Sequence, residues 1–386
     1  MNRRHFLKTV PAISWVALDP HLAFCAGPAT PYDRLLILIE LKGGNDGLNT
    51  VVPYADRDYY ALRPRLAIPR EQVLPLDERC GLHPSMSALL PLWRGHELAV
   101  IQGVGYPKPN LSHFRSIDIW DTASDADEYL QQGWLARAFA RTPAPADFVA
   151  DGLILGSQET GPLSGSGVRA LALDRPQRFL RQAKLATDSG HARNAALEHI
   201  LKVERDVVQS ASRLSLDRDL KTPFPQSAFG NALKTAAQVI GGEGRVAAVK
   251  ISLNGFDTHS NQLGTQARLL QELSEGLSAL RSALQEVGKW NSTLVMTYAE
   301  FGRRPKENQS GGTDHGTGNV HFALGGTVRG GLYGAPPRFS ALDANGNLPF
   351  AIDFRALYAT VLERWWGVRS DEILNRRFAA IELLKI

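Results

Sequence analysis

Residues 34–47 read RLLILIELKGGNDG, and this stretch decides the fold. Its first eight residues are almost all apolar, and a run of that length predicts a strand covered on both faces. The glycines that follow allow a sharp turn of the backbone, and Asp46 lies in that turn. Strands buried on both faces are typical of parallel sheets, so the stretch predicts an α/β protein.

Three further runs of the same character predict strands at residues 97–102, 245–253 and 292–298. Between the last two, residues 261–289 carry leucines at helical spacing. A strand, a helix and a strand in that order predict a right-handed crossover between parallel strands. Residues 321–325 predict another short strand. We therefore expect a three-layer sandwich with a mostly parallel central sheet.

The domain organisation predicted from length and composition is one α/β domain, residues 27–386, with a helical insertion at about 176–241. We expect the insertion to form a lid or the rim of a pocket, where loops set specificity. Residues 353–366 predict a C-terminal helix with Asp353 as its N-cap.

The N-terminal residues 1–26 predict a twin-arginine export signal. Arg3 and Arg4 precede a weakly apolar run that ends in small residues. A basic arm or a short membrane anchor is the alternative, but residues 19–21 (DPH) do not suit a spanning helix. We expect a protein exported by the twin-arginine machinery to the periplasm or another extracytoplasmic place, with no stable transmembrane segment after processing.

Charge and cysteine content limit the partners and the means of stabilisation. The formal net charge of +4 falls to about +2 without residues 1–26, which is too small and too evenly spread for a nucleic-acid partner. Cys25 lies in the predicted signal, so Cys80 would remain alone and could form no internal disulfide. Stability must then come from burial of the apolar residues.

Two of the predicted strands end in residues that can bind metals. Asp46 follows the first strand, and Asp257 and His259 follow the strand at 245–253. Asp257 and His259 are two apart, so in an extended segment they point the same way. Open α/β sheets keep their sites at the carboxyl ends of strands. An Asx turn at Asp46 and a solvated turn at Asp257 are the alternatives.

The densest group of such residues is Glu300, Asp314, His315 and His321, which follow the strand at 292–298. Imidazole nitrogens and carboxylate oxygens are ligands of zinc and similar ions. We expect one or two divalent ions. Zinc is the first candidate, and manganese, magnesium and calcium are alternatives.

Residues 110–114 predict the start of a helix, with Asn110, Ser112 and His113 close to its N-terminus. The helix dipole and free backbone N–H groups there suit an anionic substrate and a nucleophile. We take Ser112 as the candidate nucleophile and His113 as a proton shuttle or ligand. An ordinary N-cap serine is the alternative.

Taken in order, these motifs resemble those of the alkaline phosphatase superfamily, which includes sulfatases and phosphomutases. More narrowly, the chain resembles the exported branch known as domain of unknown function 1501, over about residues 33–367. The motifs that carry this resemblance are Gly-Gly-Asn-Asp-Gly-Leu-Asn, Ser-His-Phe, Phe-Asp-Thr-His, Glu-Phe-Gly-Arg and Asp-His-Gly.

The resemblance implies a role for each matching residue. For one ion, the implied ligands are Asp257, His259 and His315. For a second ion, they are Asp46, Ser112 and Glu300. The superfamily usually has histidine where this chain has Phe301, which leaves the second ion in doubt unless His113, Asp314 or His321 compensates. Substrate binding is expected of Asn110, Arg303 and Arg304, although both arginines also fit solvated loop positions.

The implied activity is hydrolysis or transfer of a small anionic phosphate or sulfate ester, assisted by metal, and we take hydrolysis as the prediction. Two alternatives stay open from the sequence. One is a catalytically degenerate, metal-stabilised binding protein of the envelope, favoured by Phe301. The other is a single-metal hydrolase of another ester class.

Overall fold

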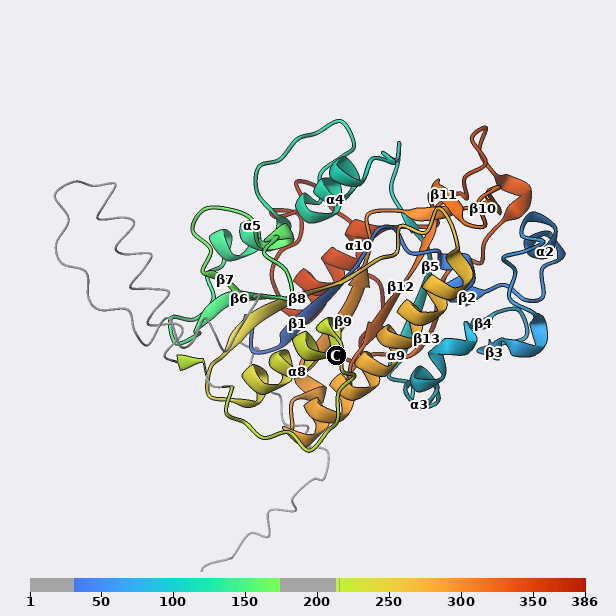
Figure 1. Cartoon of the computed structure of the whole chain (residues 1–386). Coiled ribbons are helices and arrows are strands. Elements are labelled where there is room, and N and C mark those ends of the chain that lie inside the picture. Colours follow the sequence, from blue (N-terminus) through green and yellow to red (C-terminus); the bar gives the residue numbers. More distant parts are fainter. Residues whose placement is uncertain (1–30, 174–212, 215) are drawn as a thin grey trace, which may run out of the picture.

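The structure, a computed structural model, describes residues 31–173, 213–214 and 216–386 (Figure 1). A central sheet of nine strands runs through these residues. In order across the sheet the strands are β13 (Gly331–Gly334), β5 (Leu98–Gly105), β12 (Asn319–Leu324), β9 (Thr293–Tyr298), β1 (Leu35–Lys42), β8 (Val246–Asn254), β6 (Ala150–Leu155) and β7 (Ala170–Leu173), with β14 (Ile352–Asp353) beside β5.

Strand β1 lies near the middle of the sheet and pairs in parallel with β8 on one side and β9 on the other. Its side chains alternate between the two faces. Leu36 and Leu38 lie in one hydrophobic core, and Ile37 and Ile39 lie in the other. This confirms the prediction that the apolar run at 34–41 forms a strand covered on both faces.

Helices cover both faces of the sheet (Figure 1). One core contains residues of α8 (Ala228–Gly241) and α9 (Gln262–Glu286). The other contains residues of α4 (His113–Thr122), α5 (Trp134–Arg141) and α10 (Phe354–Ala359). Helix α9 connects β8 to β9 as predicted, although β1 lies between these two strands. The three-layer α/β fold class is confirmed.

The sheet is mostly parallel. Strand β12 is antiparallel to both of its neighbours, β5 and β9, whereas the other recorded strand pairs of this sheet run in parallel. The short strand predicted at 321–325 is therefore present, within Asn319–Leu324.

A small hairpin follows β9 at the carboxyl end of β1. Its strands, β10 (Gly302–Glu307) and β11 (Thr313–Gly316), are antiparallel and place Arg303 opposite His315. Residues 302–307 have no apolar alternation, and from the sequence Arg303 and Arg304 also fitted solvated loop positions. Pairing with β11 makes them a strand.

The remaining short elements flank this frame. They are α1 (Gly47–Thr50), β2 (Val51–Val52), α2 (Arg57–Leu62), β3 (Leu74–Pro75), β4 (Gly81–Leu82) and α3 (Leu90–Arg94). The predicted C-terminal helix is formed by α10 and a π-helical segment, Thr360–Trp365. Asp353 caps it as predicted, because its side chain accepts a hydrogen bond from the Arg355 backbone N–H.

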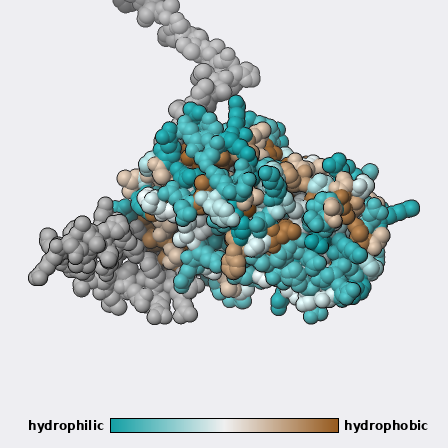
Figure 2. Space-filling model, turned by 90° about the horizontal axis from the view of Figure 1, so that it is seen from above, coloured by the Kyte–Doolittle hydropathy of each residue, from teal (hydrophilic) through white to brown (hydrophobic). Residues whose placement is uncertain are grey.

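Two sequence predictions fall wholly or largely outside the described residues: the export signal at 1–26, and most of the insertion at 176–241. The described end of the insertion includes α8, which packs with α9 against the sheet. No helix of the described segments combines the length and the apolar character that crossing a bilayer requires. The face seen in Figure 2 is mostly hydrophilic, with hydrophobic residues in small separate areas.

Candidate metal centre

Four residues from three parts of the chain form a cluster that we call the His/Asp cluster: His113, Asp257, His259 and His315. His113 begins α4, Asp257 and His259 follow β8, and His315 lies in β11. The ligand atoms of His113, Asp257 and His315 all lie within 4.8 Å of one another. The chain separates these residues by up to about two hundred positions, and the sheet and its hairpin bring them together.

Asp257 is the centre of the cluster. Its Oδ1 lies 3.1 Å from His259 Nε2 and 3.4 Å from His315 Nε2. Its Oδ2 lies 3.4 Å from His113 Nε2. Each imidazole therefore directs its Nε2 toward the same carboxylate.

The separations around Asp257 suit a metal ion, and the set whose ligand atoms all lie within 4.8 Å of one another is His113, Asp257 and His315, without His259. Four ligands at the usual zinc distances of about 2.0–2.1 Å in a tetrahedron are about 3.3 Å from one another. The Nε2 atoms of His259 and His315 are 2.9 Å apart, slightly closer than this. His315 Nδ1 donates to the Leu111 carbonyl at 2.8 Å, which leaves the lone pair of this ring on Nε2, toward His259. A lone pair on His315 Nε2 that faces another ring nitrogen needs a cation or a proton between the two atoms.

His113 is oriented from behind by Glu300. His113 Nδ1 lies 2.9 Å from Glu300 Oε1, which also accepts from the Gly43 backbone N–H at 2.9 Å. A carboxylate that holds the outer nitrogen of an imidazole fixes the tautomer in which the inner nitrogen can bind a metal. Glu300 thus contacts the cluster through the outer nitrogen of His113, whereas the resemblance implied that Glu300 is itself a metal ligand.

Asp257 is held in turn by Arg303, whose side chain is buried. Arg303 Nη2 lies 2.6 Å from Asp257 Oδ1, and the same guanidinium donates to the carbonyls of Gly43, Gly44 and Thr313. Burial would raise the pKa of Asp257, but Arg303 and the neighbouring imidazoles lower it below its usual value. The carboxylate is therefore ionised and ready for a cation.

Phe301 forms the apolar wall of the cluster. Its ring centroid lies 4.2 Å from that of His315 and 4.9 Å from that of His113. Burial, together with the charge of Arg303, lowers the pKa of His315 and keeps it neutral. A phenyl ring in this place supplies packing and cannot bind a metal.

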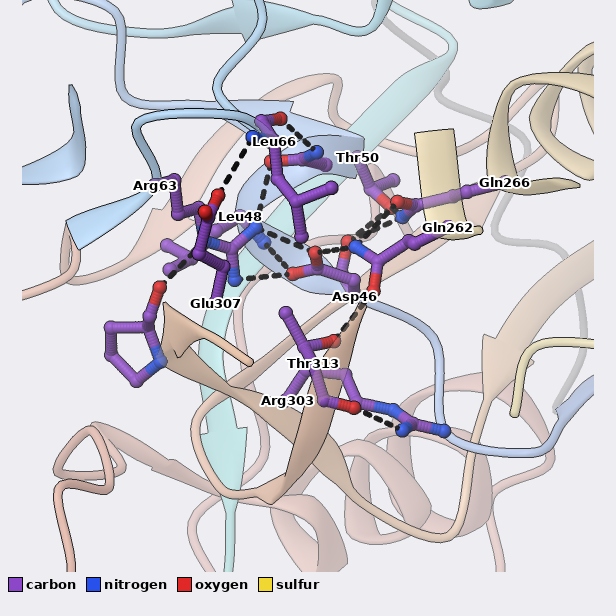
Figure 3. Close-up of polar contacts among 12 residues, drawn as sticks. Asp46, Leu48, Thr50, Arg63, Leu66, Gln262, Gln266, Arg303, Glu307 and Thr313 are labelled. Carbon is purple, nitrogen blue, oxygen red and sulfur yellow. Dashed lines mark hydrogen bonds and ion pairs between the residues drawn. The ribbon is translucent and has the colours of Figure 1, made fainter. Parts of the chain in front are cut away.

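Asp46 does not join the cluster. Its Oδ2 lies 2.6 Å from Arg63 Nη1 and 2.5 Å from Gln262 Nε2, and its Oδ1 accepts from Arg63 Nη2 at 3.0 Å (Figure 3). Oδ1 also accepts from the Leu48 backbone N–H and so caps α1. Both carboxylate oxygens are occupied by donors, and the side chains of Asp46 and Arg63 are fully buried.

A comparison with known families identifies the group to which these motifs belong. The family described as protein of unknown function (DUF1501) matches residues 78–376 of the chain. The chain belongs to DUF1501. This confirms the DUF1501 part of the resemblance drawn from the motifs, although the match leaves out the glycine turn at 43–47 and does not bear on export.

Solved structures similar to this DUF1501 chain include three with low TM-scores. The zinc complex of the C-terminal periplasmic domain of EcEptC from Escherichia coli is 11% identical, with 77% of this chain and 73% of that chain covered and a TM-score of 0.35. The PsFucS1 sulfatase from Pseudoalteromonas sp. is 12% identical, with 90% and 70% covered and a TM-score of 0.40. A mutant TAB5 alkaline phosphatase with bound Mg is 11% identical, with 79% and 94% covered and a TM-score of 0.36. No curated protein matches the chain.

At the start of α4, the DUF1501 chain presents a free serine. Ser112 is the N-cap residue, but its side chain makes no capping hydrogen bond and is exposed. It lies between Leu111, which accepts from His315, and His113 of the cluster. Asn110 holds this turn, because its Oδ1 accepts from the Ser112 backbone N–H at 2.9 Å. Asn110 thus has a structural role that the sequence did not predict.

The other predicted site residues lie around the cluster or apart from it. Asp314 Oδ1 is 3.6 Å from His259 Nδ1, on the outer nitrogen of that ring. His321 is fully buried in β12 against Trp120, and neither of its ring nitrogens has a hydrogen-bond partner among the described residues. The Arg304 carbonyl accepts from Arg63, and its buried Nε has no partner among the described residues. Arg303 is neither solvated nor free for an oxyanion, since its donors are used inside the protein.

Sequence reasoning missed a buried group beside the cluster. Glu40 of β1 and Lys250 of β8 form an ion pair at 2.8 Å, and Asp121 of α4 lies close to both. Glu40 and Asp121 line a cavity of about 620 Å³ that His113, Asp257 and Glu300 also line. An acidic residue inside an apolar strand and a lysine in the strand at 245–253 were the available signals.

Proposed function

We propose that this DUF1501 protein is a metal-dependent hydrolase of phosphate or sulfate esters that uses a single divalent ion. The observation that carries the proposal is the convergence of three Nε2 atoms on Asp257, each within 3.4 Å of a carboxylate oxygen. Three imidazoles and one carboxylate are a ligand set suited to zinc.

The residues that would hold the ion are Asp257, His259, His315 and His113. Arg303 supports Asp257 and Glu300 supports His113, as outer partners do in metal sites. A divalent ion bound there would have to accept the ester as a fifth ligand, and it would then polarise the ester group and neutralise charge on the departing oxygen. The apolar ring of Phe301 beside two of the imidazoles supports one ion rather than two.

Ser112 is the nucleophile in this proposal. Its uncapped hydroxyl lies at the N-terminus of the ten-residue helix α4, where backbone N–H groups stabilise an anion. Its oxygen forms a bond to phosphorus or sulfur while the bond to the alcohol oxygen breaks. The alcohol leaves with the serine proton, and water then releases phosphate or sulfate and restores Ser112.

Metal analysis combined with turnover of aryl phosphates and aryl sulfates tests the proposal. We expect about one zinc or manganese ion per chain, lost in Asp257→Asn, and turnover that is lost with it. Ser112→Ala should keep the ion and lose turnover, whereas the matched surface control Ser282→Ala should keep both.

Each other outcome has a definite meaning. If turnover persists in Ser112→Ala, the nucleophile is an activated water and not the serine. The proposal of a single-ion hydrolase would then still hold. A protein that binds the ion but turns over neither ester class would be the metal-stabilised binding protein. Absence of both ion and turnover would overturn the proposal.

The proposal that the protein is exported rests on its N-terminal sequence. We infer that Arg3 and Arg4 direct the chain through the twin-arginine machinery to the periplasm, where it meets small anionic esters. A reporter fused after residues 1–30 should be exported by that machinery, and replacement of both arginines by lysine should stop its export. Export of the double-lysine variant would remove this assignment.

A further inference from the structure

The cavity beside the His/Asp cluster has its own chemistry. It measures about 620 Å³ and extends from Asp257, His113 and Glu300 to a group of acidic residues at the ends of β1 and α4. An ester with its phosphate or sulfate at the cluster would place its alcohol part in this space. The charges of the lining therefore bear on which alcohols the protein accepts.

The positive side chains around the cavity are already paired. Lys42 lies 2.6 and 2.5 Å from the two carboxylate oxygens of Glu159. Lys250 lies 2.8 Å from Glu40 and also donates to the Glu159 carbonyl. Among the described lining residues, no lysine or arginine is left for a second anion. The cavity thus does not suit an alcohol that is itself negatively charged.

Two carboxyl groups of the lining have no lysine or arginine partner among the described residues. Glu300 is 3% exposed, and its Oε2 has no partner among the described residues, while Oε1 accepts from Gly43 and His113. Asp121 makes no ion pair with the residues that the structure describes, and among them its hydrogen-bond partner is the Tyr298 hydroxyl at 3.5 Å. Burial raises the pKa of Asp121 well above its usual value. The charge of Lys250 lowers this pKa, and the charge of Glu40 raises it further. A cation bound beside Asp121 would stabilise its ionised form.

An exposed aromatic residue completes the lining. Phe114, in the first turn of α4, is 89% exposed, and it lines the same cavity as Asp121 and Glu300. Aromatic rings attract ammonium groups, and an ammonium group is also the donor that an unpartnered carboxylate takes. Because the Phe114 ring is exposed, it is free to pack against an ammonium group of a ligand in this cavity.

On the basis of the proposed function, we propose that this cavity is a subsite for a positively charged ammonium group on the alcohol part of the ester. The ammonium would lie among Asp121, Glu300 and Phe114 while the phosphate or sulfate occupies the cluster. The substrate class is then a zwitterionic ester rather than a simple anionic one.

Paired substrates test the subsite in the zinc-loaded protein. We compare 4-(aminomethyl)phenyl phosphate and sulfate with the 4-(hydroxymethyl)phenyl esters, which have nearly the same shape and no charge on the alcohol part. We expect kcat/KM to favour the ammonium esters by about fivefold or more. Phe114→Ala and Asp121→Asn should reduce this ratio toward one, whereas the controls Tyr129→Ala and Asp127→Asn, which lie outside the cavity lining, should keep it.

A binding measurement separates failure of the subsite from failure of the proposed function. Protonated benzylamine, titrated calorimetrically into the zinc-loaded protein, should bind more tightly than benzyl alcohol, and Phe114→Ala should weaken it. Binding without turnover of any ester would support the subsite and overturn the hydrolase. If the protein turns over both kinds of ester without preference for the ammonium esters and does not bind benzylamine, the subsite proposal is wrong and the hydrolase proposal still holds. Phe114 is on the surface, so its variant tests the idea even if Asp121→Asn fails to fold.

Discussion

Glu300 Oε1 lies 2.9 Å from His113 Nδ1, so the carboxylate holds the outer nitrogen of the imidazole whose Nε2 faces Asp257. The resemblance implied Glu300 as a metal ligand, and the sequence left His113 as a proton shuttle or a ligand. In the structure the histidine lies in the cluster, and the glutamate orients it from a buried place at the end of β9.

This relationship predicts the effect of neutralising Glu300. Glu300→Gln should lower metal affinity by about 10- to 100-fold without abolishing binding, because an orienting partner is weakened while the ligands remain. Zinc titration against a competing chelator measures the change. Glu275→Gln, an exposed control on α9, should have no effect. Complete loss of the ion in Glu300→Gln would make Glu300 a direct ligand.

Metal removal should destabilise the folded protein. An ion that binds the native cluster and not the unfolded chain stabilises by about 2.7 kcal/mol when its concentration is 100 times Kd. Chelation should therefore lower Tm, and zinc should restore it. In His315→Gln, Tm should depend much less on zinc. Equal Tm with zinc and with chelator in the unmodified protein would contradict a bound structural or catalytic ion.

Asp46 should be important for stability and not for metal content. Its buried pair with Arg63 has both partners fully enclosed, so Asp46→Asn leaves the arginine charge without its counter-ion. We expect a loss of about 3–5 kcal/mol in the free energy of unfolding, measured with denaturant. Zinc stoichiometry should stay that of the unmodified protein under native conditions. If the Asp46→Asn protein is stable but binds less metal, Asp46 is a metal ligand.

His321 should make stability fall in acid. Burial lowers its pKa to about 3 from 6.5, so the native protein keeps the ring neutral while the unfolded chain takes up a proton below pH 6.5. The contribution of His321 to stability is complete above pH 6.5 and declines until about pH 3, and the loss at pH 5 is about 2 kcal/mol.

His321→Leu tests this, because it removes the titrating ring and two unpartnered nitrogens from the core. Its stability should depend less on pH between 6.5 and 4 and should equal or exceed that of the unmodified protein at pH 5. A pH dependence identical in both proteins would show that other groups cause the acid destabilisation.

Local sequence patterns were enough to predict the frame. The apolar run of β1 and the leucine spacing of α9 set element type through side-chain periodicity, which is a local property. The Asp353 cap was predictable for the same reason. The hairpin of β10 and β11 was not, because its polar residues form strands only by pairing with each other.

The sequence by itself determined which chemical groups the protein can bring to a metal: imidazoles and carboxylates after strand ends, with Phe301 in place of one of them. Tertiary structure decided which of these groups meet. Asp46 faces Arg63, His321 lies in the core against Trp120, and His113 joins Asp257 and His315. The reason is physical: residue type fixes the donor atoms, whereas the direction of each side chain depends on packing and counter-charges supplied by distant segments.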